Sequence, residues 1–127
     1  MQNARMDSNP QRPSGVTVTE TFFSVEVTDM ARASGFYAAA LGAEVVFASP
    51  GWSSLRIAGV RLGLALSPQA TGTRCGLHFA VGDLGAARSE IERAGGRLIG
   101  GATEVAPGVF VADVTDTEGN TFTLAQR

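Results

Sequence analysis

Two side chains combine a reactive group with an unusual position in the sequence, namely Glu26 and His78. Glu26 lies in the mainly apolar segment 22–27, and carboxylates are seldom buried in such segments unless they are paired or functional. His78 is the only histidine, and histidine is the side chain best suited to gain and lose a proton near neutral pH. Together the two residues could act as a catalytic acid and base, or as hydrogen-bonding groups for a ligand.

Each of these residues also has a structural interpretation, and the sequence leaves both interpretations open. Glu26 could lie at a solvated rim, or it could pair with Arg56 or Arg61. His78 could be half-buried, with its ring bonded to a backbone carbonyl, because buried polar groups nearly always find such a partner.

Other residues have the chemistry to contact a ligand without reacting with it. Trp52, the only tryptophan, could stack on an aromatic or sugar-bearing molecule, or it could be a core or dimer-contact residue. Arg56 could bind an anion bidentately or remain a solvated side chain. The ligand-binding residues that we expect are Phe22, Ser24, Trp52, Arg56 and Thr123.

The candidates are distributed over two copies of one sequence unit. Residues 22–42 align with residues 76–96 without a gap, with Asp29 matching Asp83 and Gly42 matching Gly96. Each copy predicts a strand, an aspartate that caps a helix, the helix itself and a glycine that ends it. Two such copies tend to associate around a pseudo-twofold axis, which would bring Glu26 and His78 to opposite sides of one shared site.

The hydrophobic pattern predicts the order strand–helix–strand–strand–strand twice. Helices are expected from residue 30 to 41 and from 84 to 94, and strands over 21–27, 43–48, 52–57, 60–66, 75–81, 97–99, 109–113 and 121–125. This order indicates an α+β protein with a curved, mixed sheet whose outer face is covered by the helices. Strand alternation places Ser24, Glu26, His78 and Thr123 on the opposite, cup-forming face.

Composition excludes several classes of function. The formal net charge of -2 over 127 residues argues against a nucleic-acid partner, and no apolar run approaches the roughly 20 residues of a membrane span. All basic residues are arginine, which excludes lysine Schiff-base chemistry. The single cysteine, Cys75, excludes an intrachain disulfide and fits a cytoplasmic protein. The polar residues 1–16 predict a disordered tail.

Three segments carry a resemblance to a known family. They are VEVTDMARASGFYAAALGAEV (Val25 to Val45), AVGDLGAARSEIERAGGRL (Ala80 to Leu98) and VTDTEGNTFTL (Val114 to Leu124). In these segments the chain resembles the vicinal oxygen chelate superfamily of glyoxalases, bleomycin-resistance proteins and extradiol dioxygenases. The resemblance implies one domain over residues 17–127, with modules at 20–67 and 74–126, and a homodimer.

The same resemblance implies where metal ligands would lie, and this chain lacks them. Metal-dependent members carry His or Gln seven residues before each helix-capping aspartate, where this chain has Phe22 and Gly76. A glutamate expected in the last strand is replaced by Thr123, and the segment Arg61 to Leu66 contains no Glu, Gln or His. Since such sites need imidazole nitrogens and carboxylate oxygens, we expect no metal and no other cofactor.

The expected function is therefore metal-independent binding of a small organic molecule, similar to an antibiotic or a metabolite, in an apolar cup. Two alternatives stay open. The chain could be a lyase, isomerase or dioxygenase that uses Glu26 and His78 or relocated metal ligands. It could also be an interaction module without a small-molecule ligand.

Overall fold

The computed structural model describes residues 15–127, so the predicted tail over residues 1–16 falls almost entirely outside the described residues. The first module comprises β2 (Phe23–Val27), α1 (Met30–Leu41), β3 (Glu44–Ala48), β4 (Trp52–Ile57) and β5 (Val60–Leu66). The second comprises β6 (Arg74–Ala80), α2 (Leu84–Arg93), β7 (Arg97–Ala106), β8 (Val109–Thr115) and β9 (Thr121–Gln126). The predicted βαβββ repeat is confirmed.

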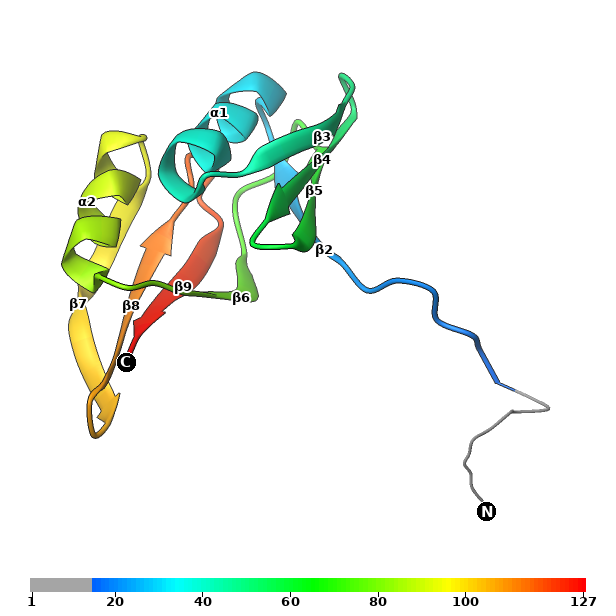
Figure 1. Ribbon diagram of the computed structural model, residues 1–127. Helices are drawn as coiled ribbons and strands as arrows, with labels where there is room; N and C mark the ends of the chain where they lie inside the picture. Colours follow the sequence, from blue (N-terminus) through cyan, green and yellow to red (C-terminus); the bar gives the residue numbers. More distant parts are fainter. Residues whose placement is uncertain (1–14) are drawn as a thin grey trace, which may run out of the picture.

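Each module forms its own four-stranded mixed sheet. The strand orders are β2-β5-β4-β3 and β6-β9-β8-β7, with one parallel pair in each sheet, β2 with β5 and β6 with β9. Figure 1 shows α1 along the first sheet and α2 along the second, with the two helices next to each other. The first strand of each module is thus an edge strand. None of the helices in the described part of the chain is long and apolar enough to cross a membrane.

Both helices begin where the sequence predicts, and α1 also ends there, whereas α2 ends at Arg93, one residue before the expected end. The Asp29 carboxylate accepts a hydrogen bond from the backbone N–H of Arg32, and Asp83 does the same for Ala86. These bonds satisfy N–H groups that have no partner within the helix. Gly42 ends α1 in the left-handed conformation at φ 66°, and its N–H donates to the carbonyl of Tyr37.

The core lies between the helices and the inner faces of the sheets. Val25 and Val27 of β2 are buried, as are Phe122 and Leu124 of β9, as the alternation predicted. Phe23 differs from this expectation, because it is 44% exposed although it belongs to the same inward-facing row. Phe23 instead borders a groove between the modules.

Strand β7 is longer than the sequence indicated. We expected a strand over residues 97–99 only, whereas β7 continues to Ala106. The register with β8 shifts between Ile99 and Thr103, so the extra residues form an irregularity within the strand. Gly100, at φ 65°, adopts the backbone conformation that this bulge requires.

A buried polar network joins the two modules. Asp116, which follows β8, is 2% exposed and accepts a hydrogen bond from the Tyr37 hydroxyl of α1 at 2.7 Å. The side-chain amide of Asn120 donates to Asp116 and also to the backbone carbonyl of Glu26 in β2, both at 3.0 Å. Burial, and then the neighbouring Asp116 carboxylate, raise the pKa of Tyr37. The hydroxyl therefore remains protonated and continues to donate its bond.

Glu118 of the same loop caps the first helix of the other module. Its carboxylate accepts bonds from the backbone N–H of Thr28 at 2.9 Å and of Asp29 at 3.1 Å, and from Nε of Arg32 at 2.8 Å. Burial of the carboxyl opposes ionisation, but the hydrogen bonds, that from Arg32 foremost, lower the pKa of Glu118 to about 2. The charged carboxylate also interacts favourably with the N-terminus of α1.

We predict that Glu118→Gln lowers the free energy of unfolding by about 1–3 kcal/mol at pH 7, because charged hydrogen bonds of this kind are lost. Because its pKa is lowered in the folded state, the ionised Glu118 carboxylate stabilises the fold at pH values above 4.5, the ordinary pKa of a glutamate. This stabilisation is lost as the pH falls toward about 2. The difference between wild type and variant should therefore narrow below pH 4.5. Urea denaturation at pH 7, 5 and 3 measures it.

The matched control is Glu92→Gln, an exposed glutamate on α2. It should leave the free energy of unfolding within about 0.5 kcal/mol of wild type. A gap between Glu118→Gln and wild type that stays constant across this pH range would contradict the proposed ionic cap.

Candidate functional site

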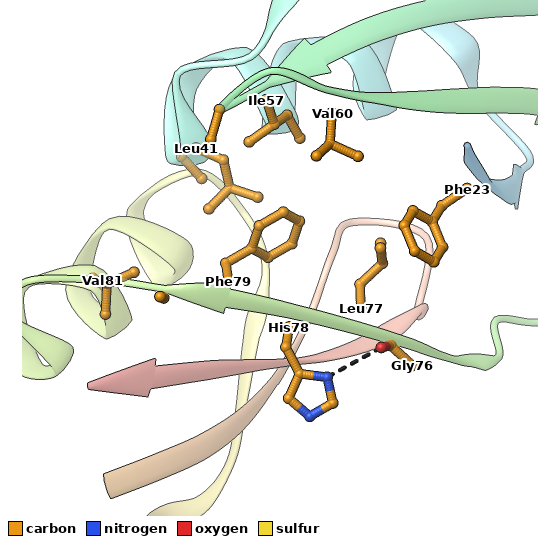
Figure 2. Close-up of a pocket in the computed structure, with 13 residues that line it drawn as sticks. Phe23, Leu41, Ile57, Val60, Gly76, Leu77, His78, Phe79 and Val81 are labelled. Atoms are coloured by element: carbon orange, nitrogen blue, oxygen red, sulfur yellow. Dashed lines mark hydrogen bonds between the residues drawn. The ribbon is translucent and has the colours of Figure 1, made fainter. Parts of the chain in front are cut away.

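An apolar groove of about 690 Å³ lies between the two modules. Figure 2 shows Leu77 and Phe79 pointing into it from β6, with Phe23 of β2 and Val60 of β5 facing them. Leu41 at the end of α1, Ile57 at the end of β4 and Val81 just after β6 also line it. The side chains that line it are almost all apolar, and His78 borders it without directing its ring inward.

His78 faces away from this groove. Figure 2 shows its ring on the opposite side of β6 from Phe79, as strand alternation requires. Its Nδ1 lies 3.1 Å from the backbone carbonyl of Gly76. A contact of the ring with a backbone carbonyl is what we expected if His78 has a structural role. The side chain is exposed rather than half-buried.

His78 shares one face of the second sheet with Thr123 and Asp113. Thr123 is the register partner of both His78 and Asp113, and its hydroxyl donates to the Asp113 carboxylate at 2.7 Å. Arg74 forms an ion pair with the other oxygen of Asp113, also at 2.7 Å. Hydrogen bonds from Arg74 and then Thr123 lower the pKa of Asp113. Our sequence analysis did not select Arg74 or Asp113, although Asp113 alternates with the buried residues Ala112 and Val114.

An aromatic cluster occupies the corresponding face of the first sheet. The rings of Phe22 and Trp52 meet edge to face, with centroids 6.3 Å apart. The indole Nε1 of Trp52 donates to the hydroxyl of Ser54 at 3.1 Å. The six-membered part of the indole lies over Gly63, where an added Cβ would come within 2.1 Å of Trp52 Cη2. Ser24 is the register partner of Gly63 on β2 and therefore belongs to the same face.

Arg61 joins this cluster, and our sequence analysis considered it only as a partner for Glu26. Its guanidinium lies 3.9 Å from the centroid of the Phe22 ring, and its Nη1 donates to Ser54 at 3.1 Å. Its Nε and Nη2 bond to Glu20, and this contact lowers the pKa of Glu20 and raises that of Arg61. Strand alternation in the segment 60–66 was the available signal, because it places Arg61 in the same row as Gly63.

The structure divides the predicted site residues between two sheets. Phe22, Ser24, Trp52 and Glu26 belong to the first sheet and its approach, whereas His78 and Thr123 belong to the second. Within residues 15–127, Glu26 and His78 form no hydrogen bond or ion pair with each other. The alternative pairing of Glu26 with Arg56 or Arg61 is not formed in the described part of the chain, where Arg56 lies 3.8 Å from Glu44 and Arg61 contacts Glu20.

The residues at the metal-ligand positions do not fit a metal ion. Phe22 contributes an aromatic ring, Gly76 has no side chain, and the Thr123 hydroxyl is engaged by Asp113. Across residues 15–127, no three side chains from His, Cys, Asp and Glu lie close enough together to hold an ion. We therefore assign no chemical step to a metal.

Comparisons with known proteins identify the fold. The family model described as a glyoxalase-like domain matches residues 22–125. A glyoxalase/bleomycin resistance protein/dioxygenase family enzyme from Burkholderia phytofirmans is 19% identical, with a TM-score of 0.72 and coverage of 82% of this chain and 95% of that chain. The fosfomycin resistance protein FosX from Listeria monocytogenes is 13% identical, with a TM-score of 0.75 and coverage of 88% and 95%. No curated protein matches the chain significantly.

The close approach of Trp52 to Gly63 yields a test of the aromatic cluster. Gly63→Ala should displace the indole, shift the emission maximum of the only tryptophan and lower the free energy of unfolding by about 1–3 kcal/mol through overpacking. Gly82→Ala is the matched control, because nothing lies within 4 Å of its added Cβ. Unchanged emission in Gly63→Ala would show that Trp52 does not pack as described.

Proposed function

Because the chain belongs to the glyoxalase-like domain family, we propose that it binds a small organic molecule on the aromatic face of the first sheet, without a metal ion. The observation that carries this proposal is the cluster of Phe22, Trp52, Ser54 and Arg61. Small-molecule sites are mainly apolar and aromatic, with a few polar groups that fix the orientation of the ligand. This cluster has that composition.

The cluster is also organised before any ligand binds. Ser54 is 5% exposed and receives bonds from both the Trp52 indole and the Arg61 guanidinium. Gly63 allows the indole to lie flat against the sheet. Side chains held in place in this way lose little conformational entropy when a ligand arrives, which favours binding.

The chemistry of the expected metal positions supports the metal-independent part of the proposal. None of Phe22, Gly76 and Thr123 supplies an imidazole or a carboxylate, which are the groups that divalent ions require. Solved structures of the same fold include proteins named for resistance to bleomycin and to fosfomycin. On the basis of those names, we propose that the ligand of this chain is similar to an antibiotic or a metabolite.

The experiment is a thermal-shift screen of chelator-treated protein against aromatic metabolites and antibiotics, since a ligand specific to the folded state raises its Tm. For a stabilising compound, we predict that Trp52→Leu weakens binding about two- to tenfold, in line with the value of an aromatic contact. Phe110→Leu, on the second sheet, should leave the affinity unchanged. Stoichiometric metal in the purified protein, or equal affinity in both variants, would contradict the proposal.

We also propose that the chain forms a homodimer whose second copy covers the apolar groove. Phe23 and Val60, on its rim, are 44% and 48% exposed. The groove lies along the free edges of β2 and β6, and exposed apolar patches at unpaired edges favour association. We further propose a cytoplasmic location, and the free thiol of Cys75 is consistent with a reducing compartment.

Light scattering tests the dimer. We predict that wild type has the mass of two chains and that Val60→Glu, which buries a charge in the covered groove, shifts the protein toward the monomer. Val105→Glu on β7 is the control, because Val105 is similarly exposed but lies outside the groove. A monomeric wild type, or equal dissociation of both variants, would contradict this assembly.

A further inference from the structure

The guanidinium of Arg61 already holds a carboxylate, and that carboxylate belongs to the chain itself. Arg61 donates from Nε to Oε2 of Glu20 at 2.8 Å and from Nη2 to Oε1 at 2.9 Å. Two parallel bonds to the two oxygens are the geometry by which arginine recognises free carboxylates. Glu20 therefore shows how an anion fits at this position of the sheet.

Arg61 is positioned by residues other than Glu20. Ser54 accepts a bond from Nη1 at 3.1 Å, and the Phe22 ring lies 3.9 Å below the guanidinium carbon. Ser54 is in turn bonded by the indole of Trp52. These contacts would keep the guanidinium in place if Glu20 withdrew, with its Nε and Nη2 directed toward solvent.

Glu20 is the replaceable member of the pair. It belongs to residues 15–22, which form neither helix nor strand and are exposed throughout. Ion pairs between exposed side chains contribute little stability, because solvent competes for both partners. An incoming carboxylate can therefore take the place of Glu20 at a small energetic cost.

The charges around Arg61 favour an anion at this end of the sheet. Arg56 is the register partner of Arg61 on β4 and lies 3.8 Å from Glu44. The hydrogen bond from Arg61, and to a smaller extent the charge of Arg56, lower the pKa of Glu20, so an ionised carboxylate is favoured here. Glu26 lies on the same face, as the register partner of Ala65. Ala65 is four residues from Arg61 along β5, and at the rise of a strand this separates the two positions by about 13 Å. Arg61 and Glu26 thus place opposite charges at the two ends of this face, which would orient an asymmetric ligand once Glu20 is displaced.

From this geometry we propose that the aromatic face binds an organic carboxylate with a flat apolar body. Its carboxylate replaces that of Glu20 on Arg61, and its apolar body lies against Phe22 and Trp52. Glu20 acts as an internal competitor that covers the site when no ligand is present. This inference rests on the proposed function and specifies the ligand class for the same site.

The experiment compares two matched probes, 2-naphthoate and its neutral analogue 2-naphthalenemethanol, by titration calorimetry and by emission of Trp52. In wild type, naphthoate should bind more tightly than the alcohol. Glu20→Gln should strengthen naphthoate binding about three- to sixfold by removing the competitor, with little effect on the alcohol. Arg61→Gln should abolish the preference for naphthoate, whereas Arg97→Gln, an exposed arginine on β7, should preserve it.

The outcomes separate this inference from the proposed function. If the alcohol binds as tightly as naphthoate in wild type and in Glu20→Gln, the anion site is wrong while organic-ligand binding stands. If neither probe binds in any variant, both proposals fail for this ligand class. Because Glu20 lies outside the helices and strands, Glu20→Gln is decisive even if Arg61→Gln does not fold.

Discussion

The arrangement of the two modules depends on the buried carboxylate of Asp116. A buried charge is tolerated only when hydrogen bonds replace the lost water, and here the replacing groups come from both modules. Tyr37 of α1 donates to Asp116, and Asn120 joins Asp116 to the backbone of β2. Since these donors have fixed positions in the first module, the loop that follows β8 can dock in only one orientation.

That docking holds the modules together at one end of β2, in addition to the packing of α1 against α2. The loop of residues 116–120 holds the start of α1 and the end of β2, while the start of β2 remains apart from β6. Leu77 and Phe79 of β6 consequently face a groove rather than a closed core. Within residues 15–127, the edges of β2 and β6 and the apolar surface of the groove therefore have no strand or helix packed over them.

The two sheet faces have diverged in chemistry while their scaffolds stayed alike. Both helices begin at an aspartate cap, and both sheets have the same strand order. The face of the first sheet carries two aromatic rings and a preorganised arginine, whereas the second carries the polar group of Asp113, Thr123 and His78. We propose the aromatic face as the ligand site because only there do aromatic rings and a positioned arginine occur together among the described residues of the two faces.

The sequence by itself determined the elements, their order and the rows of each strand. Helix caps, glycine stops and two-residue alternation are local properties, so Asp29, Gly42 and the buried row of β2 could be predicted without tertiary information. Glu20 lies just before the strand predicted over 21–27, and nothing in the local sequence could pair it with Arg61, 41 positions away. Only the tertiary structure decided which charged side chains form ion pairs and that Gly63 makes room for Trp52. It also decided that Glu26 and His78 belong to separate sheets. These contacts depend on strand pairing and on the docking of the modules, and neither is fixed by residues that are neighbours in the sequence.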